Sequence, residues 1–316
     1  MSDNQTTVTV FILLGFPSLQ QLDFLLFIVG LVIYITTLSG NILIIAVTRL
    51  DHQLSSPMYF FLGNFSFLEI WYTCNIVPQM LAIFVIEVTT ISYPACITQL
   101  YLHICLGSAE CLILAVMAFD RYVAICNPLQ YHVVINTKVC ALLAGGVWLV
   151  AFMVNLPPLI STSQLHFCGA NTIDHFFCDT PPVLKLSCTD THTTELINFV
   201  VATMVIVSSF TLIGVSYILI MFAIVKIPSG RQKAFSTCAS HLTVVVIFYG
   251  SLMFMYVRPK SNDSFEFNKV ISIFYTVVAP MLNPIIYTLR NREVKGALRK
   301  LLKKDVNSGI VLSWKE

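Results

Sequence analysis

The sequence predicts an all-α membrane protein, a seven-transmembrane helix bundle with a short amphipathic C-terminal helix. Its composition does not fit a soluble domain, because 57% of the residues are hydrophobic and only 11% are charged, against roughly 25% charged in soluble proteins. Apolar runs long enough to cross a bilayer, which takes about 20 helical residues, recur along the chain: Phe24–Thr48, Pro57–Ile86, Ala95–Phe119, Val139–Ile160, Leu196–Val225, Ala234–Val257 and Val270–Leu289. They occupy most of residues 1–316, so we expect a single domain.

The lysines and arginines predict the orientation of this bundle. With the N-terminus outside, all but four of the 18 fall on the inner side, and the outer four are Lys185, Arg258, Lys260 and Lys269. Such an excess marks the cytoplasmic face. We therefore expect residues 1–22 to be extracellular, 23–290 to form the bundle and 291–316 to be a cytoplasmic tail of a multi-pass plasma-membrane protein. Asn4, in the sequon Asn-Gln-Thr, then lies outside and is open to glycosylation.

The first run carries no charged side chain, whereas the second and third hold one carboxylate each, Glu69 and Glu110. Carboxylates within a span face the bundle interior and find partners, because exposure to lipid is costly. Two interpretations stay open. The carboxyls are either protonated structural hydrogen-bonding groups or oxygen ligands of a small hard cation such as sodium.

The third run ends in Asp120-Arg121-Tyr122. An acid–base pair at a membrane edge is costly unless it is paired or near water. An arginine held there by its neighbouring aspartate can be released, which is the chemistry of a switch. The alternative is an interfacial ion pair beside an aromatic anchor.

The fourth run leads into the longest connection, residues 161–195, which faces outward. This connection contains Cys168, Cys178 and Cys188, and Cys96 lies at the outer mouth of the third run. Four cysteines in an oxidising compartment suggest two disulfides, for which three connectivities exist.

The fifth and sixth runs are uncharged, and the seventh contains Pro280-Met281-Leu282-Asn283-Pro284-Ile285-Ile286-Tyr287. Pro284 removes a backbone donor, which predicts a kink or hinge. Asn283 can bond the backbone groups that this frees, and Tyr287 offers a hydroxyl one turn further in. After this run, residues 290–304 have the basic and apolar pattern of a helix lying on the membrane surface.

Other classes of protein are less well supported. The chain has no nucleophile elbow, HExxH, paired CxxC or phosphate-binding glycine loop, so we expect no enzyme and no cofactor besides the sodium considered above. The competing hypothesis is a transporter or a cation or proton channel that uses Glu69, Glu110 and Asp120. An odd number of helices and the absence of an inverted repeat weigh against it.

Taken together, these residues resemble the vertebrate olfactory receptors, a branch of the rhodopsin-like G-protein-coupled receptors. The resemblance runs from about Phe11 to Leu301 and is carried by several motifs: Gly40-Asn41, PMYFFL at Pro57–Leu62, MAFDRYVAICNPL at Met117–Leu129, Ser216-Tyr217, KAFSTCASHL at Lys233–Leu242, and Pro280–Tyr287. MAFDRYVAIC combined with KAFSTCASHL is highly specific for this family.

The resemblance implies an odorant site among the outer halves of helices three, five, six and seven. By helix register and resemblance, its candidate residues are His103, Ile104, Gly107, Ser108, Cys111, Ala202, Val205, Ile206, Tyr249, Leu252, Met253, Tyr256 and Thr276. This mostly apolar lining with a few hydrogen-bonding groups fits a small, neutral, fairly hydrophobic ligand.

The resemblance also implies coupling to a stimulatory, olfactory-type G protein that raises cyclic AMP, with membrane lipid as the other partner and no nucleic acid. The implied switch and coupling residues are Asp120, Arg121, Tyr122, Tyr217, Asn283, Pro284 and Tyr287. The implied disulfides are Cys96–Cys178 and Cys168–Cys188. Glu69 and Glu110 match a place where related receptors hold sodium.

Overall fold

The computed structural model describes residues 8–51, 54, 56–86, 88–168, 170–226, 231–257, 265–290, 294 and 296–297. Over the same residues it describes the side chains, except at 18, 226–241, 257, 265–266 and 287–290. Asn4, Tyr287 beyond its backbone, and nearly all of the predicted C-terminal helix therefore lie outside the described residues.

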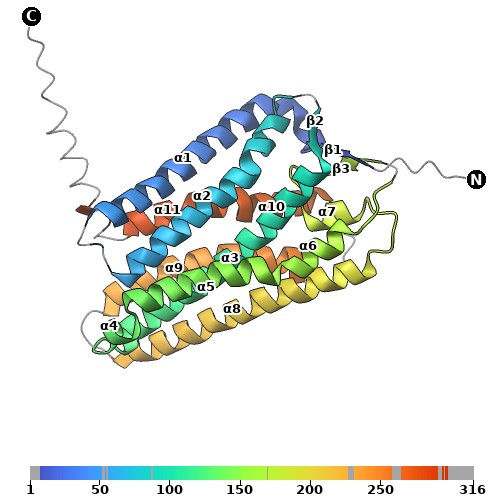
Figure 1. The fold of residues 1–316 in the computed structure, drawn as a ribbon. Helices are drawn as coiled ribbons and strands as arrows, with labels where there is room; N and C mark the ends of the chain where they lie inside the picture. Colours follow the sequence, from blue (N-terminus) through green and yellow to red (C-terminus); the bar gives the residue numbers. More distant parts are fainter. Residues whose placement is uncertain are drawn as a thin grey trace, which may run out of the picture.

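Within the described residues the chain forms seven helical rods packed side by side (Figure 1). In chain order the rods are α1 (Asp23–Leu50), α2 (Pro57–Ile83), α3 (Tyr93–Cys126), α5 with α6 (Thr137–Val154 and Leu156–Ser163), α8 (His192–Lys226), α9 with η3 (Arg231–Leu252 and Met253–Val257), and α10 with η4 and α11 (Phe265–Ile273, Phe274–Val278 and Ala279–Arg290). The predicted helix bundle is confirmed.

Five of the described helical stretches could cross a membrane by length and composition: Leu19–Leu50, Tyr93–Cys126, Thr137–Ser163, His192–Val225 and Phe267–Ile286. The second and sixth rods fall short for different reasons. Polar side chains such as Glu69, Asn75 and Gln79 lower the hydropathy of α2, and the apolar part of the sixth rod, Leu242–Tyr256, is shorter. Both rods pack against other rods of the bundle, α2 against α1 and α3, and α9 against α8 and α11.

Helix α3 is the central rod. In the most apolar 18-residue stretch of α3, 67% is buried, against 11% in that of Leu19–Leu50 at the edge of the bundle. Helix α3 packs against α2, α5 and α8. Side chains on α3 therefore face protein on several sides. This is why its polar residues find partners from many elements.

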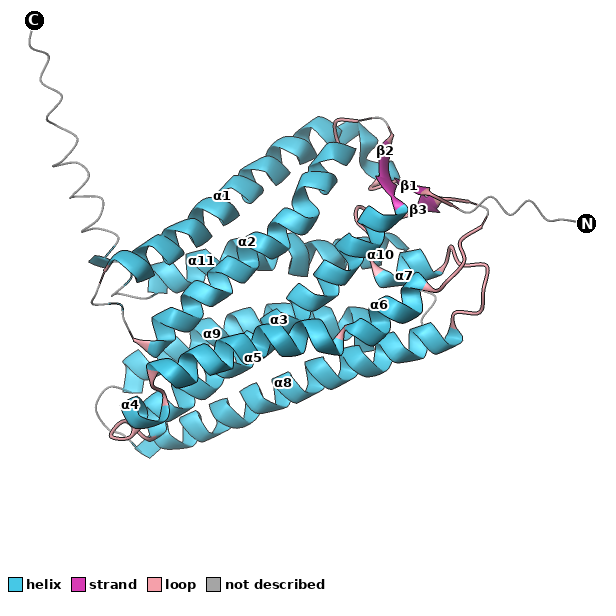
Figure 2. Cartoon of the chain, in the orientation of Figure 1, coloured by secondary structure: helices cyan, strands magenta, loops and turns pink. Residues whose placement is uncertain are grey.

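One end of the bundle, called here the disulfide end, carries a small sheet with the strand order β2-β1-β3 (Figure 2). β1 (Val10–Leu13) pairs antiparallel with β2 (Thr89–Ser92) and parallel with β3 (Thr172–Ile173). The short 3-10 helix η1 (Pro17–Leu22) and the helix α7 (Thr180–Leu184) complete this end. At the opposite end, called the arginine end, α4 (Tyr131–Val134) follows α3.

Prolines set two features of the rods. The run Val139–Ile160 was expected to be a single helix, but it is divided at Asn155, because Pro157 and Pro158 lack the backbone donors that would continue α5. Pro284 lies inside α11 and approaches α1 closely: a Cβ added to Gly40 would meet the Cβ of Pro284 at 2.9 Å. Glycine at position 40 permits this contact.

The sixth and seventh rods each contain a π-helical turn, η3 and η4, toward the disulfide end. π-Turns insert an extra residue into a helix and occur often at functional sites. Here they carry Tyr256 and Tyr275, whose hydroxyl oxygens lie 3.1 Å apart.

Candidate functional site

A buried polar network joins α3, η3 and the η4 region of the seventh rod to the loop before α7. The Tyr256 hydroxyl donates to the Asp179 carboxylate at 3.0 and 3.2 Å, and it lies 3.2 Å from His103 Nε2. Tyr275 lies 3.1 Å from Tyr256 and donates to Ser272 at 3.3 Å. Three rods and one loop therefore share a single hydrogen-bonded cluster at the level predicted for the ligand.

Aromatic rings hold the His103 imidazole in place. Tyr72 of α2 stacks on it with centroids 5.4 Å apart, and Phe177 of the loop packs edge-on at 4.8 Å. His103 is only 3% exposed, and its Nδ1 has no hydrogen-bond partner among the described residues. The ring is therefore held in one position, and its Nδ1 has no hydrogen-bond partner there in the described part of the chain.

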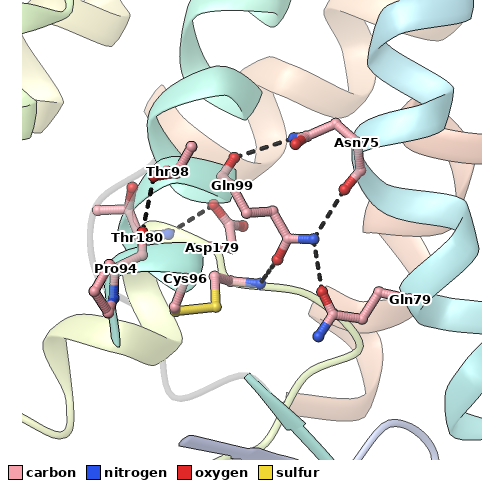
Figure 3. Close-up of a disulfide and its surroundings, with 9 residues drawn as sticks. Asn75, Gln79, Pro94, Cys96, Thr98, Gln99, Asp179 and Thr180 are labelled. Carbon is pink, nitrogen blue, oxygen red and sulfur yellow. Dashed lines mark hydrogen bonds between the residues drawn. A yellow bond between two sulfur atoms is a disulfide. The ribbon is translucent and has the colours of Figure 1, made fainter. Parts of the chain in front are cut away.

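Covalent and polar links position the loop that carries Asp179 (Figure 3). A disulfide joins Cys178 to Cys96 at the start of α3, and the Cys178 amide donates to the Gln99 side-chain oxygen at 2.9 Å. The second disulfide, Cys168–Cys188, lies within the same connection. These are the two pairs that the family resemblance implied.

Asp179 itself is fully buried and begins α7 by accepting a hydrogen bond from the Thr180 amide at 2.7 Å. Burial raises the pKa of Asp179 to about 6, although the bonds from Thr180 and Tyr256 oppose this. The carboxyl is therefore ionised at neutral pH and accepts hydrogen bonds only.

Open space lies one turn along α3 from His103. Gly107 is partly accessible, and a Cβ added there would meet no atom within 4 Å. His103 and Cys111, one turn to either side on the same face, are 3% and 1% exposed. Gly107 therefore has open space beside it, between two buried positions on the same face of α3.

A second tyrosine, Tyr249 of α9, lies at the level of Cys111, one turn along α3 from Gly107. The Tyr249 hydroxyl lies 3.0 Å from the Cys111 carbonyl and 2.8 Å from Ser209 Oγ, so it links α9 to α3 and α8. Phe210 packs against its ring with centroids 5.5 Å apart. The Tyr249 hydroxyl is therefore already hydrogen-bonded within the bundle.

Most of the apolar residues predicted to bind the ligand lie in the main core of the bundle, and three of the predicted residues have other contacts. Val205, Ile206 and Leu252 belong to the main core cluster, and Ala202 and Met253 pack against it. Ile104 packs with the cluster at the disulfide end, and the Ser108 hydroxyl accepts a hydrogen bond from Asn155 at 2.9 Å. Thr276 donates to the Ser272 carbonyl on its own helix.

Sequence reasoning missed Asp179, Tyr275, Tyr72, Phe177 and Ser209. The position of Asp179 could have been predicted, because it directly follows Cys178, and the implied disulfide places Cys178 at the start of the third helix. The aromatic residues had no such signal, since their spacing is equally typical of a packed core.

A second polar cluster lies deeper in the bundle, around the two carboxylates. Asn283 of α11 donates through Nδ2 to Glu69 Oε1, and Glu69 and Glu110 are close enough to interact directly. Several buried oxygens of this region have no hydrogen-bond partner among the described residues: Asn41 Oδ1, Ser66 Oγ, Glu69 Oε2, both Glu110 oxygens and Asn283 Oδ1.

These oxygens fit a small hard cation, which prefers carboxylate, amide and hydroxyl ligands. No group of three or more His, Cys, Asp or Glu residues gathers in the described part of the chain. A cation here would therefore need amide or hydroxyl oxygens besides the two carboxylates.

At the arginine end, Asp120 holds Arg121 only loosely. The closest distance between them, Nη2 to Oδ2, is 3.9 Å, while the Tyr131 hydroxyl of α4 donates to Asp120 Oδ1 at 2.7 Å. Burial and this hydrogen bond raise the pKa of Tyr131, so the hydroxyl remains a donor. The Arg121 side chain is 20% exposed, whereas Asp120 is 2% exposed.

The structure gives the other predicted switch residues the following neighbours. Tyr217 of α8 is buried in the main core cluster, and Tyr122 packs against the same cluster. Pro284 contacts the face of α1 at Gly40.

Comparisons with known proteins agree with these features. The family model described as "Olfactory receptor" matches residues 31–305. Olfactory receptor 226 of Rattus norvegicus is 50% identical over 301 residues, which cover 93% of this chain and 92% of the relative. Olfactory receptors 6Y1 and 6X1 of Homo sapiens are each 49% identical, cover 95% of this chain, and are themselves covered to 93% and 96%.

Seven helical rods, a loop linked by a disulfide to the central helix, and an arginine at the opposite end of that helix define a seven-helix membrane receptor of the G-protein-coupled class. The relatives in this class are receptors, not enzymes. The chain belongs to the olfactory receptor family.

Proposed function

We propose that this chain binds a small, mostly apolar odorant near the disulfide end and activates a stimulatory, olfactory-type G protein that raises cyclic AMP. The disulfide end then faces the outside of the plasma membrane, and the arginine end faces the cytoplasm. The family of its relatives and the positive-inside distribution of basic residues support this placement.

The observation that carries the proposal is the loose hold on Arg121. At 3.9 Å the ion pair with Asp120 lacks a hydrogen bond, and Asp120 is engaged by Tyr131 instead. A ligand that favours one of two bundle arrangements shifts the population toward it. In the favoured arrangement Arg121 engages the G protein.

The test replaces Arg121 with alanine in the full-length receptor. The variant should reach the cell surface and lose odorant-evoked cyclic AMP. Arg49→Ala is the matched control and should keep the response, because Arg49 is an exposed arginine of α1 at the same end of the bundle. A full response from Arg121→Ala, or ligand-driven flux in proteoliposomes without G protein, would overturn the assignment.

We further propose that sodium binds between Glu69 and Glu110 and stabilises the resting arrangement. The buried oxygens without partners around them support this ligand set. Wild-type receptor in sodium chloride should melt at a higher temperature and show lower basal activity than in choline chloride at equal ionic strength. The double variant Glu69→Gln, Glu110→Gln should lose both differences. A wild type that is insensitive to sodium contradicts the proposal.

A further inference from the structure

The hydrogen bonds around Tyr256 determine where its proton lies. A phenol has one proton to donate, and an ionised carboxylate can only accept. Tyr256 therefore donates to Asp179 at 3.0 Å, and its oxygen can only accept from His103 Nε2, which lies 3.2 Å away. The contacts with Asp179 and with His103 then each have one donor and one acceptor.

This arrangement assigns the tautomer of His103. Nε2 must carry the ring proton, which leaves Nδ1 as a bare acceptor. That atom is buried in a side chain only 3% exposed, and no described residue donates to it. An unpaired buried acceptor is unfavourable, and a donor that reaches it is bound more tightly.

Open space for such a donor lies one turn from the histidine. The open space at Gly107 begins one turn away on the same face of α3. Ala202 of α8 and Met253 of η3 are partly buried apolar side chains that pack against the main core cluster. A small apolar molecule with one polar group fits these surroundings.

We propose that this receptor prefers ligands that carry a hydroxyl donor, alcohols or phenols, and that His103 Nδ1 accepts their hydrogen bond. The inference rests on the proposed odorant-receptor function and names the ligand class of the same site. Aldehydes, ketones and ethers have acceptors only, so they leave Nδ1 unpaired. Asp179 is a positioning residue, because it sets the tautomer of His103 through Tyr256.

The same proton count predicts how the preference can be reversed. In Asp179→Asn the side-chain oxygen still accepts from Thr180, while its NH₂ group donates to the Tyr256 oxygen. The Tyr256 proton is then free to go to His103 Nε2. The imidazole proton moves to Nδ1, which becomes a donor and favours carbonyl ligands.

The experiment measures cyclic AMP in cells that express the full-length receptor. The probes are linear C6–C10, branched, cyclic and aryl skeletons, each supplied as the alcohol, the aldehyde or ketone, and the methyl ether. For every skeleton that activates the wild type, the alcohol should have an EC50 about tenfold lower than the other two members.

Three variants separate the roles of the residues. His103→Phe keeps an aromatic ring against Tyr72 and Phe177 but removes both nitrogens, so the advantage of the alcohol should disappear. Asp179→Asn should bring carbonyl members level with the alcohols or below them in EC50. Asp190→Asn, an exposed aspartate of the same loop, should leave the ranking unchanged. Surface staining normalises every response.

The outcomes are distinct. A wild type that responds to carbonyl, ether or hydrocarbon members as well as to alcohols contradicts the ligand class alone, and so does an alcohol advantage that survives His103→Phe. If His103→Phe does not reach the surface, an unchanged ranking in Asp179→Asn overturns the inference. Wild-type receptor that reaches the surface and answers no probe contradicts the proposed function itself.

Discussion

At the residue scale, Gln99 shows how one side chain organises the disulfide end. Its amide nitrogen donates to the Asn75 carbonyl and to Gln79 Oε1, both at 2.9 Å, and its oxygen accepts the Cys178 amide at 2.9 Å (Figure 3). Asn75 returns a bond to the Gln99 carbonyl at 3.1 Å. Because these groups are shielded from water, losing one partner would leave several others unpaired.

Gly40 offers a test of packing at a single atom. Alanine there would place its Cβ 2.9 Å from the Pro284 Cβ, so we expect Gly40→Ala to destabilise the receptor by about 1–3 kcal/mol through overpacking. Gly145→Ala is the control, since a Cβ there meets nothing within 4 Å and helix propensity favours alanine by up to about 1 kcal/mol. Melting temperatures in detergent measure both. Equal melting of the two variants would show that α1 and α11 can separate.

Asp179 predicts a pH dependence of stability. Its pKa is about 6 in the folded receptor against 3.8 in the reference state, so the folded state binds the proton more tightly. Stability from this group is therefore gained as pH falls through 6 and lost as pH rises. Buried His175 has the opposite effect. Burial and the charge of Lys269 lower its pKa to about 3, so this histidine makes the folded receptor less stable as the pH falls below about 6.5.

Asp179→Asn separates these two effects, because asparagine resembles the protonated acid at every pH. The variant should melt at a higher temperature than the wild type at pH 7.5, and this difference should become smaller as the pH is lowered to 5. A difference that stays constant over this range would mean that Asp179 does not titrate there.

At the element scale, the connection between α6 and α8 is anchored twice, and the two anchors differ in reach. Cys96–Cys178 spans 82 residues and Cys168–Cys188 spans 20. The first ties β3 and α7 to the central helix, so that Asp179 meets Tyr256. The second closes the loop on itself.

Removing each disulfide should therefore have unequal effects. Loop-closure entropy gives about 4.5 kcal/mol for the long link and about 3 kcal/mol for the short one. We expect the double variant Cys96→Ser, Cys178→Ser to lose most surface expression and its odorant response, and Cys168→Ser, Cys188→Ser to retain more of both. Flow cytometry and cyclic AMP report the two effects, and the reverse ranking would contradict the anchoring role.

At the scale of the whole molecule, the distribution of charge predicts the topology. An epitope placed before Met1 should bind antibody on intact cells, whereas an epitope placed after Glu316 should bind only after permeabilisation. The excess of basic residues on one side is the physical reason, since these residues resist translocation. Staining of the C-terminal epitope on intact cells would reverse the proposed orientation.

The rods were predictable from sequence because crossing a membrane requires long apolar runs, and these are visible without any partner. Their ends were less predictable: α3 continues to Cys126, past Asp120 and Arg121, where the charge-free run had ended. The break at Asn155 was missed although Pro157 and Pro158 were in view.

The candidate site was only partly predictable. His103 and Tyr256 were found from helix register and family resemblance, and they do meet. Asp179 was missed, because its position depends on a loop path that no periodicity encodes. The neighbours of Ser108 and Ile104 depend on how each rod is rotated, which packing decides.

By itself the sequence determined that this chain crosses a membrane as a helical bundle, with an acid–base pair at the end of its third helix and four cysteines in the loop region. These follow from local composition, which acts on each segment separately. Only the tertiary structure decided which polar atoms are paired. The proton of Tyr256 goes to Asp179, and Nδ1 of His103 is left without a donor, because a disulfide brings the loop to three rods at once.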